Sequence, residues 1–140
     1  MKEIYFYALF AIIVALQSML IISGFLSPLS SYSTNNILFS LFLIIIVIYM
    51  GWDLAKLGLK KVAIKGVIAA IVSVIIISLF SVIGYILKRP ILGITLPSIY
   101  YLPIPFLSMA LLNVILYAFF AVLGAWLAKE MKPSRKIKKK

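Results

Sequence analysis

The chain is predicted to be an all-α polytopic membrane protein with four transmembrane helices packed as antiparallel hairpins. Three observations predict this class. First, 65% of its 140 residues are hydrophobic and only 12% are charged, whereas soluble domains are roughly half apolar and about a quarter charged. Second, four apolar stretches reach the length of about 20 residues that a helix needs to cross the hydrocarbon core. Third, the basic residues lie at the ends of these stretches and in a C-terminal tail.

The first span is expected over residues 4–26, which carry no charge. It has the position of a cleavable signal peptide, but its apolar run exceeds the usual 7–15 residues of a signal core, so we interpret it as a transmembrane helix. The second span is expected over residues 35–54. Its strictly apolar part, 37–50, reaches spanning length only if the preceding asparagines or the residues up to Leu54 are helical.

The third span is expected over residues 66–87. It is rich in β-branched residues, which would favour a strand in water but are ordinary in lipid-facing helices. The fourth span is expected over residues 102–128. The remaining residues, 129–140, form a polybasic tail.

The connections between these spans differ in charge. Residues 27–36 are uncharged, residues 51–65 contain four lysines and one aspartate, and residues 88–105 contain four prolines. Twelve basic residues fall on the N-terminal flank, in the second connection and in the tail, against two in the third connection. Because basic flanks are retained in the cytoplasm, we expect both termini to be cytoplasmic and the protein to lie in the cell membrane of a prokaryote.

Small residues recur along one face of the third span and again in the fourth. Such faces let helix backbones approach closely in a membrane. We interpret them as candidate helix-packing faces, within one chain or between chains: Gly66, Ala70, Ser73, Ser81, Gly84, Ala121, Gly124, Ala125 and Ala128.

Three polar side chains stand out inside the spans, namely Gln17, Asn113 and Tyr117. Asn113 and Tyr117 are four residues apart and therefore share a helix face. They are candidates for lining a ligand path, although side chains of this kind also form hydrogen bonds between helices. We favour the hydrogen-bonding interpretation.

The basic tail is a candidate contact for anionic lipid headgroups, since each basic residue near such a surface contributes about 1 kcal/mol. Binding to acidic RNA is an alternative, and so is a purely orienting role, which we favour. No nucleic-acid partner is expected, because no folded basic domain accompanies the net charge of +11. The candidate lipid-contacting residues are Lys132, Arg135, Lys136, Lys138, Lys139 and Lys140.

The third connection is proline-rich and yet apolar, which is unusual for a loop in water. It either lies in the membrane interface or enters the membrane, and irregular backbone at depth must be buried in protein or line a wet cavity. Tyr100 and Tyr101 are therefore candidates for contacting a partner.

The chemistry available to the chain is narrow. It has no Cys and no His, and its three acids, Glu3, Asp53 and Glu130, lie at or beyond the ends of the spans. No phosphate-binding loop or nucleophile–base arrangement is present. We expect no catalytic residue, cofactor or metal, and no enzymatic activity.

The expected function is that of an accessory or structural subunit of a membrane assembly. Its partners would be membrane lipids together with another membrane protein or a second copy of the chain, and no small-molecule substrate is indicated. Two alternatives remain open: a small oligomeric transporter or channel, and a lipid-organising protein that uses the basic tail.

Overall fold

A computed structural model describes residues 2–31, 33–93 and 103–131, and these are almost entirely helical. Their order is α1 (Lys2–Ser23), α2 (Thr34–Asp53), the short 3₁₀ helix η1 (Ala55–Leu57), α3 (Leu59–Ile86) and α4 (Pro103–Met131). Each of the four α-helices is long and apolar enough to cross a membrane. The prediction of an all-α protein with four membrane-spanning helices is confirmed.

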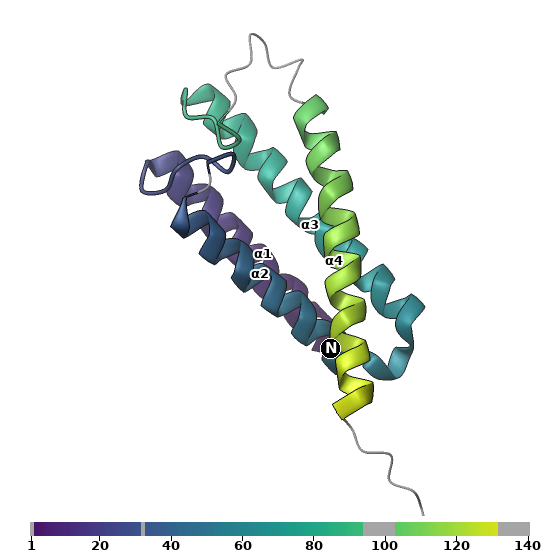
Figure 1. Ribbon diagram of the computed structural model, residues 1–140. Coiled ribbons are helices and arrows are strands. Elements are labelled where there is room, and N and C mark those ends of the chain that lie inside the picture. The colour runs from purple at the N-terminus through teal and green to yellow at the C-terminus, as the bar shows by residue number, and fades with distance from the viewer. Residues whose placement is uncertain (1, 32, 94–102, 132–140) are drawn as a thin grey trace, which may run out of the picture.

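The four helices form a bundle in which α1 and α2 make one antiparallel hairpin and α3 and α4 the other (Figure 1). The most extensive contacts are those of α4 with α3 and with α2, followed by those of α1 with α3. The start of α1, η1 and the last turn of α4 lie at one end of the bundle, which we call the basic end. The connection between α1 and α2 and residues 88–93 lie at the opposite end.

Apolar side chains cover the outside of the bundle as well as its centre. Large residues remain more than half exposed on each helix, among them Ile12, Phe42, Leu79 and Phe119. In water these side chains would be an extensive unsatisfied apolar surface, whereas in lipid they face a solvent as apolar as themselves. The bundle is therefore built as an integral membrane protein.

Three helix boundaries differ by three or more residues from those expected: α4 ends at Met131 instead of residue 128, and a glycine lies at each of the other two. Gly24 has a φ angle of +85° and ends α1 at Ser23, three residues before the expected end. Gly58 has a φ angle of +88° and immediately precedes α3, which begins seven residues earlier than expected. The first turns of α3 carry lysines, whose long side chains can reach an interface while their helix enters the membrane.

Candidate functional site

The interior of the bundle contains a hydrogen bond between two amide side chains. Gln17 of α1 donates from Nε2 to Oδ1 of Asn36 on α2 at 3.3 Å, and both residues are buried. The bond joins the two helices of the first hairpin near the opposite end. Gln17 therefore makes a hydrogen bond between helices, as polar side chains within membranes commonly do.

Asn36 also organises the connection that precedes α2. Its Nδ2 donates to the carbonyl oxygens of Pro28 at 2.9 Å and Ser27 at 3.1 Å, while its backbone N–H donates to Oγ of Ser33, the N-cap residue. We did not single out Asn36 from the sequence. The available signal was its place three residues after a serine at the start of an apolar run, which is typical of a capped helix.

The two connections at the opposite end contact each other. The backbone N–H of Leu29 donates to the carbonyl of Ile91 at 2.7 Å, and the guanidinium of Arg89 donates to the carbonyl of Ile22 at 3.3 Å. Arg89 thus bonds to one of the last carbonyls of α1, where a cation is favoured. These bonds hold the two hairpins together at this end.

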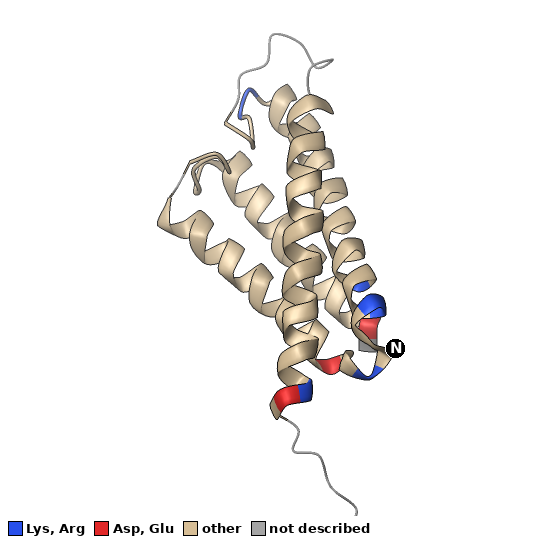
Figure 2. Ribbon diagram, turned by 45° about the vertical axis from the view of Figure 1, so that its right-hand side comes forward, with Lys and Arg blue, Asp and Glu red and all other residues tan. Residues whose placement is uncertain are grey.

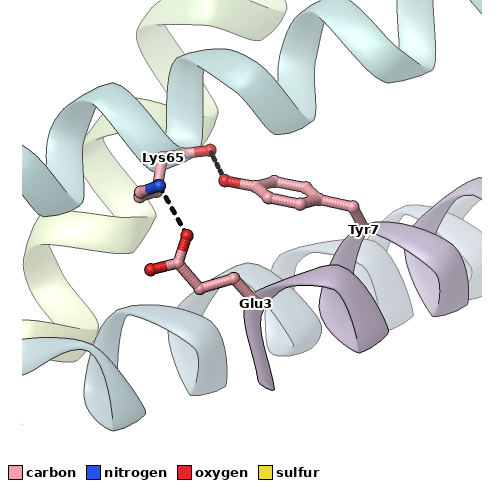
Figure 3. A network of polar contacts seen from close by, with 3 residues as sticks. All are labelled: Glu3, Tyr7 and Lys65. Carbon is pink, nitrogen blue, oxygen red and sulfur yellow. Dashed lines mark hydrogen bonds and ion pairs between the residues drawn. The ribbon is translucent and has the colours of Figure 1, made fainter. Parts of the chain in front are cut away.

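A second polar network joins the hairpins at the basic end (Figure 3). The carboxylate of Glu3 lies 2.5 Å from Nζ of Lys65 on α3, and the hydroxyl of Tyr7 donates to the backbone carbonyl of Lys65 at 3.3 Å. Glu3 and Tyr7 are one turn apart on α1, so both reach the same residue. The sequence indicated only a helix-end role for Glu3 and missed this pairing.

Charged side chains are concentrated at the basic end (Figure 2). The lysines of η1, of the first turns of α3 and of the end of α4 lie there together with the three acids, whereas Lys88 and Arg89 lie at the opposite end. No Asp, Glu, Lys or Arg occurs in residues 4–52, 66–87 or 103–128. The interior therefore offers no ionisable carboxylate or amine.

Three glycines bring helix backbones into direct contact in the half of the bundle nearer the basic end. A Cβ atom on Gly51 of α2 would overlap the carbonyl of Ala121 on α4, and one on Gly124 would overlap the carbonyl of Ile48. Likewise, a Cβ atom on Gly66 of α3 would overlap the carbonyl of Tyr117. The backbone of α4 thus packs closely against α2 and α3. Gly51, which we had not singled out as a helix-packing residue, belongs to this contact.

The other small residues singled out from the sequence are buried, but their contacts vary. Ser73 donates to the carbonyl of Ala70 in its own helix at 3.0 Å, and Oγ of Ser81 is buried without a hydrogen-bond partner in the described part of the chain. Gly84 lies against the carbonyl of Arg89 and the side chain of Ile91, in the turn that ends α3. Three alanines of α4 are completely buried: Ala121, Ala125 and Ala128.

The remaining two intramembrane polar residues lie apart from the Gln17–Asn36 bond. Tyr117 is buried, and its ring meets that of Phe10 edge-on, with centroids 5.3 Å apart. Asn113, one turn away on the same helix, is half-buried. This contact of Tyr117 fills the centre of the bundle between α1 and α4, where it acts as an aromatic packing contact.

Beyond the glycine contacts, α3 and α4 diverge towards the opposite end and leave an open groove of about 550 Å³. Its walls are almost wholly apolar and come from these two helices alone: Val74, Ser78, Val82, Pro103, Phe106, Leu107 and Ala110. The groove contains no charged group that could bind or activate a polar substrate. It is an open apolar groove on the outside of the bundle.

Other candidates lie outside the described residues. These are Tyr100 and Tyr101 and the lysines and arginine of the tail from Lys132 onward. Among the residues that the structure describes, no group of three or more acids could hold a metal ion.

The chain was compared with protein families, curated proteins and solved structures, and nothing matches it in any of the three. Its function must therefore be argued from its own geometry.

Proposed function

We propose that the protein is an accessory or structural subunit that associates with other membrane components through its lipid-facing helix surfaces, and that it has no catalytic or proton-coupled activity of its own. The observation that supports this most is the close contact of α4 with α2 and α3. Where Gly51, Gly66 and Gly124 bring backbones together, the interior has no room for a polar pathway.

The polar groups of the interior support the same proposal. Gln17 and Asn36 bond to each other, and Asn36 also bonds to two backbone carbonyls. These hydrogen bonds stabilise the fold. Proton-coupled transporters usually carry an ionisable side chain within the membrane, and the spans of this chain have none. The exposed apolar side chains on the four helices then form the surface through which the protein works.

The charge asymmetry supports a specific orientation. The basic end carries most of the lysines (Figure 2), and basic flanks remain in the cytoplasm. The proposed arrangement places both termini and the connection between α2 and α3 in the cytoplasm, in the cell membrane of a prokaryote.

Site-specific photo-crosslinking tests the proposed association. A crosslinking residue is placed at Phe42 on α2, Ile75 on α3 or Leu112 on α4, which are all exposed and lie on different helices. The proposal expects a discrete crosslinked product from one face and only diffuse lipid products from the others. The same partner should copurify with the chain in mild detergent. Diffuse products from all three positions, without copurification, would contradict it.

Reconstitution tests the alternative that the chain is a small oligomeric transporter. Purified protein in liposomes is expected to show no substrate uptake driven by a pH gradient. Robust uptake that is lost in Asp53→Asn or Glu130→Gln would replace the accessory-subunit proposal with a transporter.

A further inference from the structure

A pocket of about 390 Å³ opens at the basic end, between η1 and the last turns of α4. We call it the basic pocket, and its lining residues are Ala55, Lys56, Gly58, Ala128 and Lys129. The two alanines are buried, whereas Lys56 and Lys129 are exposed. The pocket thus has a small-residue floor and a lysine on each of the two elements that form its walls. Its volume lies within the range of about 300–1,000 Å³ that is typical of small-ligand sites.

The charges near the pocket favour an anionic ligand. Lys60 and Lys61 follow on the first turn of α3 and are exposed, whereas Lys65 is already paired with Glu3. The remaining acids at this end are Asp53 and Glu130, both exposed. At this end, four lysines that are not paired with Glu3 therefore outnumber the two remaining acids, and the net charge is positive.

The backbone beside the pocket adds to this preference. Gly58 precedes α3, and no side chain caps the start of that helix. The first N–H groups of a helix have no acceptor within it and favour negative charge. Ligand binding at the pocket would supply acceptors to a helix start that no side chain of the described residues caps.

Exposed apolar side chains at this end favour a lipid over a soluble anion as the ligand. Leu57 and Leu59, which flank Gly58, are each 40% exposed, and Met131, two residues after Lys129, is 67% exposed. A phospholipid presents a charged headgroup joined to hydrocarbon chains, and it meets both kinds of surface at once. A free phosphate ion would contact only the lysines and not the apolar side chains.

We propose that the basic pocket binds the phosphate headgroup of an anionic phospholipid in the adjacent leaflet, with Lys56 and Lys129 pairing with the phosphate and the neighbouring leucines contacting its chains. Basic pockets between transmembrane helices are suited to such headgroups. This site belongs to the folded helices and is distinct from the tail. It does not depend on the proposed subunit role.

Native mass spectrometry of the full-length protein in neutral detergent tests the site, with short-chain phosphatidylglycerol, short-chain phosphatidylcholine and inorganic phosphate as probes. One phosphatidylglycerol should bind in preference to phosphatidylcholine. Lys56→Gln/Lys129→Gln should weaken its binding about 30-fold, because each lysine near an anionic lipid contributes about a factor of five. Lys138→Gln/Lys139→Gln removes the same charge from the tail and should leave that binding unchanged.

A charge-preserving variant, Lys56→Arg/Lys129→Arg, separates charge from damage to the fold and should bind phosphatidylglycerol like the unaltered chain. Equal losses in the pocket and tail variants would overturn the proposal in favour of diffuse attraction. Displacement of the lipid by inorganic phosphate at equal concentration would overturn it in favour of a soluble anion. Equal binding of phosphatidylcholine to the unaltered chain, a result that needs no variant, would also overturn it.

Discussion

Gly51 of α2 lies against the backbone carbonyl of Ala121 on α4, so closely that no Cβ atom fits at position 51. Any larger residue must push the two helices apart. Gly51→Leu is therefore expected to lower the free energy of unfolding in detergent by about 3 kcal/mol, at the upper end of ordinary overpacking costs. Ala8→Leu is the matched control, because Ala8 is exposed on α1 and its change should cost little. Equal effects of the two substitutions on unfolding would argue against the close approach of α2 and α4.

Asn36 is expected to matter more for stability than Gln17, its partner. Asn36→Leu removes the bond to Gln17 and the donations to the carbonyls of Ser27 and Pro28, and each such hydrogen bond contributes about 0.5–1.5 kcal/mol. Gln17→Leu removes only the interhelical bond, which is worth about 0.6–2 kcal/mol in membranes. Unfolding of the two variants in mixed micelles measures the difference.

The neighbouring residue provides the control for this comparison. Asn35 is exposed, so Asn35→Leu should leave the free energy of unfolding nearly unchanged. If Gln17→Leu lowered the free energy of unfolding as much as Asn36→Leu, the bonds of Asn36 to the connection would contribute no measurable stability.

The ion pair between Glu3 and Lys65 is expected to contribute little stability. Both side chains are partly exposed, at 34% and 27%, and pairs near water are worth about 0–1 kcal/mol. Glu3→Gln should therefore shift unfolding by no more than this, and high salt should reduce the shift. Glu3→Lys combined with Lys65→Glu should restore the loss caused by either change alone. A loss of several kcal/mol for Glu3→Gln would show that the pair is desolvated.

Cysteine labelling in intact cells tests the orientation. The chain has no native Cys, and Ser27 and Lys60 are exposed at opposite ends of the bundle. An impermeant thiol reagent should label Ser27→Cys in intact cells. It should label Lys60→Cys only after the membrane is permeabilised. The reverse pattern would place the basic end outside.

Hydrophobicity and length were sufficient to predict four spans, because crossing lipid demands about 20 apolar residues whatever their contacts. The residues at which the helices begin and end were harder to predict. The early start of α3 depends on the positive φ of Gly58 and on lysines that a helix can carry at an interface. The φ angle has no counterpart in hydropathy, and the lysines lower the mean hydropathy, so a hydropathy criterion starts the span after them.

The contacts between helices were less predictable than the helices themselves. Spacing places Gly66 and Gly124 on faces that allow close approach, but it does not say which helix approaches them. Gly51 lay beyond the apolar run and so escaped notice. The two carbonyl partners of Asn36, on Ser27 and Pro28, lie nine and eight residues away in an irregular connection, where no periodic pattern applies.

The position of α4 between α2 and α3 has a consequence for biosynthesis. Ala121 and Gly124 leave the ribosome long after Gly51 and Gly66, and at about 5–20 residues per second the delay is several seconds. During that time the glycine faces of α2 and α3 have no helix to cover them. The nascent bundle is therefore most open to lipid, to an insertion factor or to an incorrect neighbour just before its last helix arrives.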